Sequence, residues 1–189
     1  MFTELIKKIA KALDKLKIPY MVIGGQAVLL YSAPRLTQDI DITLGVDTDN
    51  LSAIKKLCSD LKLQIKVKNV EKFVKETMVL PAEDPKTKIR ADFIFSFSPY
   101  EREAIKRASK VHIEGYAARF ASVEDVIIHK IFAARAIDLA DVSNIIVKVG
   151  IGKIDTGYIK KWLKQLQTSS CSVDMIAVFD SIIKEINQR

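Results

Sequence analysis

The sequence predicts an α+β fold, in which a mixed β-sheet flanked by helices is followed by a C-terminal helical bundle. Short apolar or alternating segments separated by helical segments dominate the first 121 of the 189 residues. From Ser122 onward only helical periodicity remains, and Ser122-x-x-Asp125 has the spacing of a capped helix start. We therefore expect two parts, residues 1–121 and residues 122–189, that pack together.

The first part is expected to alternate between helices and strands. Apolar residues recur at helical spacing over residues 2–16, with lysines between them, which predicts an amphipathic helix. Gly24-Gly25 separates a short buried strand from a short apolar helix, and residues 39–44 alternate as a strand with one solvated face does. The expected elements are a strand over 20–23, a helix over 26–31, a strand over 39–44, a helix near 50–61, a strand near 62–67, a helical turn over 70–76, strands over 77–83 and 89–95, a helix over 99–109 and one or two strands within 111–120.

The second part is expected to contain helices only. The segments with helical periodicity lie near 123–136, 138–148, 155–167 and 172–187.

The composition is that of a folded, basic protein. Hydrophobic residues make up 49% and charged residues 28%, which excludes a disordered tail protein. Lysine and arginine number 30 against 23 acidic residues, giving a formal net charge of +7. This balance suits a polyanionic partner such as a nucleotide or a nucleic acid, and solubility alone is the other interpretation.

Cysteine content and hydropathy bear on localisation. Cys58 and Cys171 cannot build a disulfide framework, and neither has a CxxC partner, which indicates a reducing compartment. No apolar run reaches the roughly 18 residues that a membrane helix needs, and residues 1–16 do not resemble a signal peptide. We therefore expect a cytoplasmic protein without a membrane segment.

Asp39 and Asp41 are the first candidate metal ligands. Residues i and i+2 of a strand point to the same face, about 6.6–7 Å apart. Two carboxylates at this distance repel each other unless a cation lies between them, and Mg²⁺ prefers such oxygen ligands. An isolated Asp-x-Asp is also typical of a solvated strand face, so the pair needs further support.

Three neighbouring features supply that support. Gly24-Gly25 lies at a strand-to-helix junction, where free backbone amides can bind phosphate oxygens. Arg35 and Thr37 offer a cation and a hydroxyl to the same anion. Asp92 lies within an apolar strand, where a lone carboxylate would be costly to bury. If the strands of the three aspartates are neighbours, their carboxylates could hold two metal ions roughly 3.5–4 Å apart for in-line displacement at phosphorus.

These residues carry a family resemblance. The pattern is Gly24-Gly25-x-Ala27 followed by Arg35-x-Thr37-x-Asp39-x-Asp41. It resembles the DNA polymerase beta-like nucleotidyltransferase superfamily, and within it the type IV toxin (abortive-infection) nucleotidyltransferase-like proteins and their small uncharacterised relatives. The resemblance implies a nucleotidyltransferase fold whose glycine turn, Gly24 and Gly25, binds an NTP. It also implies that Asp39, Asp41 and Asp92 are catalytic and bind two Mg²⁺ ions.

A second motif in the helical part supports the same resemblance. It reads Lys130-x-x-Ala133-x-Arg135-x-x-Asp138-x-x-Asp141. By the resemblance, Lys130 and Arg135 face the nucleotide phosphates, whereas Asp138 and Asp141 anchor the helix or assist the acceptor. On one continuous helix Lys130 and Asp141 would differ by about 20° in direction. An exposed helix with salt bridges is the alternative interpretation.

Two positions depart from the family pattern. Gly25 replaces the usual serine, so no hydroxyl at this position can contact a phosphate. Ile137 stands where a basic residue often precedes the first helical aspartate, and its presence would reduce nucleotide affinity or narrow the choice of acceptor. Glycine-glycine is common among the small relatives, so we do not interpret Gly25 as a sign of inactivation.

The sequence thus predicts a Mg²⁺-dependent nucleotidyltransferase that moves an NMP from an NTP to an acceptor hydroxyl and releases pyrophosphate. An RNA acceptor such as tRNA fits the positive charge, and toxin activity would imply an antitoxin partner. One alternative is a non-catalytic nucleotide- or RNA-binding protein that retains the fold. Another is a sugar-nucleotide-dependent glycosyltransferase, which would leave Arg35-x-Thr37 unexplained.

Overall fold

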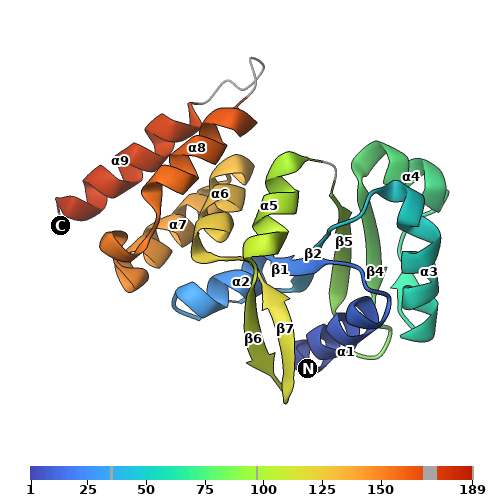
Figure 1. Cartoon of the computed structure of the whole chain (residues 1–189). Coiled ribbons are helices and arrows are strands. Elements are labelled where there is room, and N and C mark those ends of the chain that lie inside the picture. The colour runs from blue at the N-terminus through green and yellow to red at the C-terminus, as the bar shows by residue number, and fades with distance from the viewer. Residues whose placement is uncertain (35, 97, 168–173, 189) are drawn as a thin grey trace. The chain divides into compact units, whose positions relative to one another are not determined.

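The chain forms two compact units. The computed structural model describes residues 1–34, 36–96, 98–167 and 174–188. One unit, the sheet unit, comprises Met1–Gln26 and Leu36–Ala121, and the other, the helical unit, comprises Ala27–Arg35 and Ser122–Arg189 (Figure 1). The sequence predicts that all of residues 1–121 belong to the first part, whereas Ala27–Arg35 group with the helical unit.

The described residues of the sheet unit form a seven-stranded mixed sheet with the order β3-β4-β5-β2-β1-β7-β6. β2 is parallel to β5 and antiparallel to β1, while β1 is parallel to β7. The other neighbouring pairs are antiparallel. The strands are β1 (Tyr20–Ile23), β2 (Asp39–Leu44), β3 (Gln64–Ile65), β4 (Val79–Glu83), β5 (Arg90–Phe95), β6 (Ser109–Ile113) and β7 (Tyr116–Phe120).

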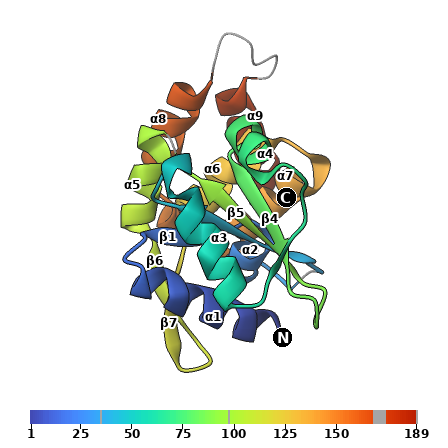
Figure 2. The same cartoon turned by 90° about the vertical axis from the view of Figure 1, so that its right-hand side faces the viewer.

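The core of the sheet unit lies against one face of the central strands. Alternation in β2 and β5 places one set of fully buried apolar side chains on this face: Ile40, Ile42, Leu44, Ala91, Phe93 and Phe95. Figure 2 shows α1 and α3 side by side over the sheet. The helices that begin in this unit are α1 (Phe2–Lys15), α2 (Gly24–Tyr31), the 3-10 turn η1 (Thr48–Asn50), α3 (Leu51–Asp60), α4 (Val70–Thr77) and α5 (Pro99–Arg107).

The helical unit buries the apolar faces of its helices against one another. Ser122 caps the first of them, because its Oγ accepts a hydrogen bond from the Asp125 amide at 3.2 Å. Its fully buried residues include Ile127, Ile145, Leu163 and Phe179, from four different helices. The helical segments from Ser122 onward are α6 (Val123–Ala133), α7 (Ala136–Val149), the 3-10 turn η2 (Ile151–Lys153), α8 (Thr156–Leu166) and α9 (Met175–Asn187).

The fold class expected from the sequence is confirmed, and so are the bounds of β1 and β2. Other bounds differ from expectation by a few residues. α2 begins at Gly24 rather than at residue 26, and β3 is reduced to Gln64–Ile65. The expected helix over 172–187 begins at Met175, after the capping residue Asp174, and residues 172 and 173 lie outside the described part of the chain.

Lys130 and Asp141 do not lie on one continuous helix, because α6 and α7 are separate. Ala134 adopts a left-handed conformation with φ +53° and donates its amide to the Lys130 carbonyl, which ends α6. α7 then begins at Ala136. The direction of the motif residues is therefore set by a turn rather than by helical periodicity.

Two further expectations concern hydropathy and cysteines. Within the described residues, every helix is too short or too polar to cross a membrane. Cys58 is a buried free thiol, and burial raises its pKa to about 12, so this thiol stays protonated at neutral pH. Cys171 lies outside the described residues.

Candidate active site

Three aspartates meet on one face of the sheet. In the parallel pairing of β2 with β5, Asp41 lies beside Asp92, and Asp39 lies beside Arg90. Neighbouring strands are about 4.8 Å apart, and paired residues of parallel strands point to the same face. The condition set by the sequence analysis, that the strands of the three aspartates be neighbours, is therefore met. All three side chains are partly exposed to solvent, unlike the fully buried residues on the opposite face.

Gly24 brings the glycine turn against this face. β1 is antiparallel to β2 and pairs Ile23 with Asp41, so that the next residue turns beside the Asp41 carboxylate. Gly24 adopts φ +63°, and a β-carbon at this position would overlap Asp41 Oδ2 and lie 2.8 Å from Asp41 Cγ. Only glycine satisfies both the left-handed backbone and this close approach.

Arg90 is the cation at this site that the sequence analysis missed. Its Nη2 lies 3.2 Å from Asp92 Oδ2, and the carboxylate side chain is 18% exposed. Burial raises the pKa of Asp92 above its usual range, Arg90 opposes this, and the nearby Asp39 adds to it. The alternation of Arg90 and Asp92 in one strand could have indicated this pair, since i and i+2 share a face.

The three carboxylates fit Mg²⁺ by their chemistry. They are hard oxygen ligands on one partly exposed face, and neighbouring carboxylates repel one another unless a cation lies between them. Among the residues described, no three His, Cys, Asp or Glu side chains stand together as a preformed metal site. Asp92 is instead paired with Arg90, so its carboxylate would have to turn from the guanidinium to share an ion with its neighbours.

Two more of the residues expected to bind the phosphates adjoin Gly24 or Asp39. Gly25 is buried within the first turn of α2. Thr37 precedes β2 and donates its hydroxyl to the Asp39 carbonyl at 3.4 Å, so it lies next to the first aspartate. Arg35 lies outside the described residues.

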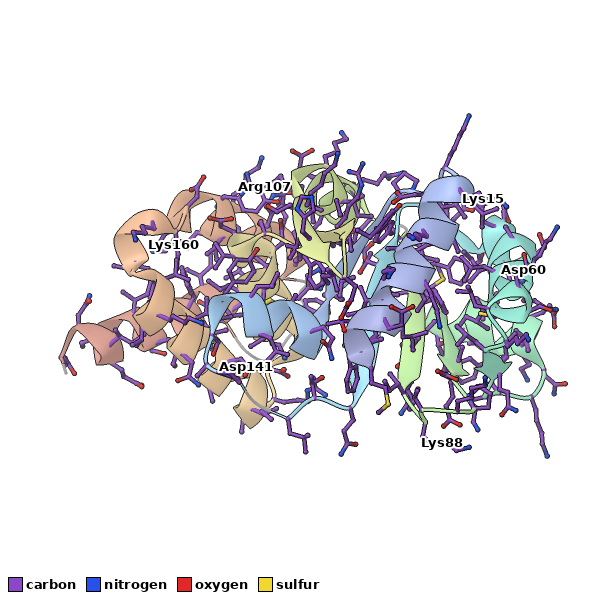
Figure 3. All side chains as sticks on the ribbon, turned by 90° about the horizontal axis from the view of Figure 1, so that it is seen from below. Lys15, Asp60, Lys88, Arg107, Asp141 and Lys160 are labelled. Atoms are coloured by element: carbon purple, nitrogen blue, oxygen red, sulfur yellow. The ribbon has the colours of Figure 1, made fainter. Side chains whose placement is uncertain are left out.

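The four residues of the helical motif form a single charge cluster in the helical unit. Lys130 Nζ lies 2.6 Å from Asp138 Oδ1 and 3.0 Å from Asp141 Oδ2, and all three side chains are buried. Arg135 completes the cluster with contacts to Asp138 of 2.5 and 3.2 Å. Figure 3 labels Asp141 on α7. Lys130 of α6 thus lies between two aspartates of α7, whereas the Arg135 side chain is 71% exposed. The roles that the family resemblance gives these residues stay predictions.

Burial and charge also set the protonation states around this cluster. Burial lowers the pKa of His129 to about 4, and the adjacent Lys130 ammonium adds to the effect, so His129 is neutral. Burial alone would raise the pKa of Asp138, but hydrogen bonds from Arg135 and Lys130 hold it below its usual range. Asp138 is therefore ionised at neutral pH.

Two buried polar groups near the aspartates also escaped the sequence analysis. They are Nε2 of Gln26, the residue after the glycine pair, and Oγ1 of Thr43, which lies on the same face of β2 as Asp41. Neither atom has a hydrogen-bond partner among the described residues. A polar residue within an apolar segment is the signal that could have indicated both.

Solved structures with this fold define its class. An antigenic nucleotidyltransferase-like protein from Paracoccidioides brasiliensis aligns with a TM-score of 0.60 and 15% identity, covering 98% of this chain and 88% of that one. ANT(2″)-Ia in complex with adenylyl-2″-tobramycin aligns with a TM-score of 0.57 and 18% identity, covering 85% and 97%. No curated protein sequence matches the chain. The fold is thus that of nucleotidyltransferases.

The family follows from the sequence itself. The family described as nucleotidyltransferase of unknown function (DUF6036) matches residues 1–182. The chain belongs to this family. The superfamily resemblance seen in the sequence is thereby confirmed, while the toxin-like subgroup stays a prediction.

Replacing Gly24 by alanine tests the contact with Asp41. We expect G24A to lower the free energy of unfolding by more than the roughly 1–2 kcal/mol that a left-handed alanine costs, because the new methyl group also displaces the Asp41 carboxylate. Gly115→Ala is the matched control, since Gly115 has φ +73° and open space around its Cβ position. Chemical denaturation of both variants measures the difference, and equal losses would contradict the contact.

Removing the Lys130 ammonium tests the charge cluster. Lys130→Met would leave Asp138 and Asp141 buried without their shared cation, so we expect the free energy of unfolding to fall by about 3–5 kcal/mol. Lys164→Met, at an exposed position of α8, should change it by no more than about 0.5 kcal/mol. Because the pKa of Asp138 is lowered in the folded state, its stabilisation should be present at neutral pH and be lost as the pH falls below about 4. Urea denaturation at several pH values measures both effects.

Proposed function

We propose that this protein is an active, Mg²⁺-dependent nucleotidyltransferase that transfers an NMP from an NTP to an acceptor hydroxyl. The observation that carries the proposal is the meeting of Asp39, Asp41 and Asp92 on one face of the sheet, beside the turn at Gly24. Membership of a nucleotidyltransferase family supports it.

Different residues of the chain would bind the triphosphate and the metal ions. Backbone amides at Gly24 and Gly25 would bind the triphosphate at the start of α2, where the helix dipole favours an anion. Magnesium ions held by Asp39, Asp41 and Asp92 would supply the positive charge that the phosphates need as negative charge builds up on the leaving group. No covalent intermediate with the protein is required.

Asp92 is the proposed proton acceptor. Its carboxylate would take the proton of the acceptor hydroxyl, and the raised pKa that burial gives it favours this transfer. The acceptor oxygen would then form a bond to the α-phosphorus as the bond to the bridging oxygen breaks, and pyrophosphate leaves. Arg90 would keep Asp92 ionised and oriented before the substrate binds.

We further propose that the acceptor is RNA. The formal net charge of +7 favours a polyanionic acceptor. A small-molecule acceptor is the competing case, and it is supported by the adenylylated compound bound to ANT(2″)-Ia. A toxin role and an antitoxin partner stay predictions of the family resemblance.

A non-catalytic nucleotide-binding protein with the same fold is the second candidate. The pairing of Asp92 with Arg90 favours it, because an aspartate engaged by a guanidinium need not bind a metal ion. For this candidate, substitution of Asp92 should leave nucleotide binding unchanged. For the proposed enzyme, the same substitution should abolish nucleotidyl transfer.

Transfer from labelled NTPs tests the proposed function. Purified protein would be incubated with each α-phosphate-labelled NTP, Mg²⁺, total cellular RNA and a small-molecule extract. We expect label on RNA, and we expect Asp41→Asn to reduce transfer by at least about a hundredfold, more than the loss typical of an outer-shell partner. Asp49→Asn, an exposed aspartate beyond the far end of β2, is the matched control and should transfer normally.

Each outcome of this assay has one meaning. Label on a small molecule would establish the enzyme and overturn the RNA acceptor. NTP binding without transfer, equal in wild type and Asp92→Asn, would favour the non-catalytic protein. Neither binding nor transfer would contradict both candidates.

A further inference from the structure

A cavity lies at the opposite end of the two strands that carry the aspartates. β2 and β5 run parallel and end at Leu44 and Phe95. Beyond these ends lies a cavity of about 370 Å³ lined by Gly45, Val46, Asp47, Asn50, Ser96 and Arg102. Its volume falls within the range of roughly 300–1,000 Å³ typical of small-ligand pockets. All of its lining residues belong to the sheet unit.

This cavity is separate from the candidate active site. Ser96 is four residues beyond Asp92 in β5, and Gly45 is four residues beyond Asp41 in β2. At about 3.3 Å per residue, the two ends are roughly 13 Å apart along each strand. A ligand in this cavity would therefore be distinct from the reacting groups.

Ser96 provides a buried polar group without a partner. The residue is 6% exposed, and its backbone amide donates to the carbonyls of Leu44 and Val46, each at 3.1 Å. Ser96 is one of the residues that line the cavity, and its buried Oγ has no hydrogen-bond partner among the described residues. An unpartnered buried hydroxyl costs stability, and a ligand in the cavity would satisfy it.

Arg102 and Asp47 provide two opposite charges that do not neutralise each other. Both line the cavity, Arg102 from α5 and Asp47 from the loop after β2. Within the described part of the chain, neither side chain takes part in an ion pair. Asp47 Oδ1 accepts hydrogen bonds from the Asp49 amide and the Asn50 amide group, which fixes the carboxylate and leaves Oδ2 for another donor.

We infer that this cavity binds a small zwitterion that carries a carboxylate and an ammonium group, the chemistry of a free α-amino acid. The planar guanidinium of Arg102 matches a carboxylate, and the Asp47 carboxylate matches an ammonium group. A rotation of the buried Ser96 side chain toward the ligand would add a third contact. A ligand that bears both charges satisfies all three groups at once, whereas a simple anion is repelled by Asp47. The inference does not depend on the proposed transferase activity.

Calorimetric titration of the full chain with each standard α-amino acid tests this inference. At least one amino acid should bind to the wild type, and its analogues that lack the amine or the carboxylate should bind at least about tenfold more weakly. Arg102→Gln and Asp47→Asn should each weaken binding by a similar factor. Glutamine is a good helix former and asparagine still caps η1, so both variants keep their local structure.

Replacement of Ser96 should affect thermal stability and ligand affinity in opposite directions. Ser96→Ala removes the unpartnered hydroxyl, so the melting temperature of the free protein should stay the same or rise while amino-acid binding weakens. Lys106→Gln is the control. Lys106 is on α5, as Arg102 is, but it is exposed and lies outside the cavity, so its replacement should change neither the melting temperature nor amino-acid binding.

The contrary results are equally specific. Absence of binding by every amino acid would overturn the inference, and so would binding that survives Arg102→Gln or Asp47→Asn. Binding of inorganic phosphate with no binding of amino acids would replace the zwitterion by a simple anion and would also overturn it.

Discussion

The approach of the bare Gly24 backbone to the Asp41 carboxylate is the contact on which the candidate site depends. It joins the glycine turn at the end of β1 to the aspartate pair of β2, and it needs a residue without a side chain in the left-handed region. The parallel register of β2 with β5 then places Asp92 beside Asp41. Two backbone constraints therefore bring together residues from β2, β5 and the start of α2.

Charge balance explains how each unit tolerates its aspartates. In the helical unit, Lys130 lies between Asp138 and Asp141, and the buried cluster is satisfied within the protein. In the sheet unit, Arg90 is paired with Asp92, and its side chain is 54% exposed. Asp39 and Asp41 share the same partly exposed face. The first arrangement is suited to holding two helices together. The second presents three carboxylates on one partly exposed face, where they could bind a divalent cation, and this is the physical basis of the proposed metal-dependent reaction.

Local patterns in the sequence were sufficient for the elements that form the site. Alternation over 39–44 and the apolar run before Gly24 predict β2 and β1 with their observed bounds. No local pattern shows which strands are neighbours, so the meeting of Asp92 with Asp41 could be stated only as a condition. Arg90 was missed for a different reason: its alternation with Asp92 in one strand is a local signal, but the pairing of the two side chains was not considered.

The helical motif shows a different limit. Periodicity gives the direction of a side chain but not its depth, so the sequence could not show that Lys130 is buried between two carboxylates. Ala134 ends α6 in a left-handed conformation although neither glycine nor proline marks the turn. The packing of the helical unit, rather than local propensity, determines this turn and with it the arrangement of the cluster.

The most direct test of the central claim is to count the metal ions bound at the three aspartates. Mn²⁺ binding would be followed by electron paramagnetic resonance, with a non-hydrolysable NTP analogue present, in wild type and in Asp41→Asn. We expect about two bound Mn²⁺ ions per chain in the wild type, as a two-metal site requires, and a loss of Mn²⁺ binding in Asp41→Asn. Equal Mn²⁺ binding by the two proteins, or none by the wild type, would contradict it.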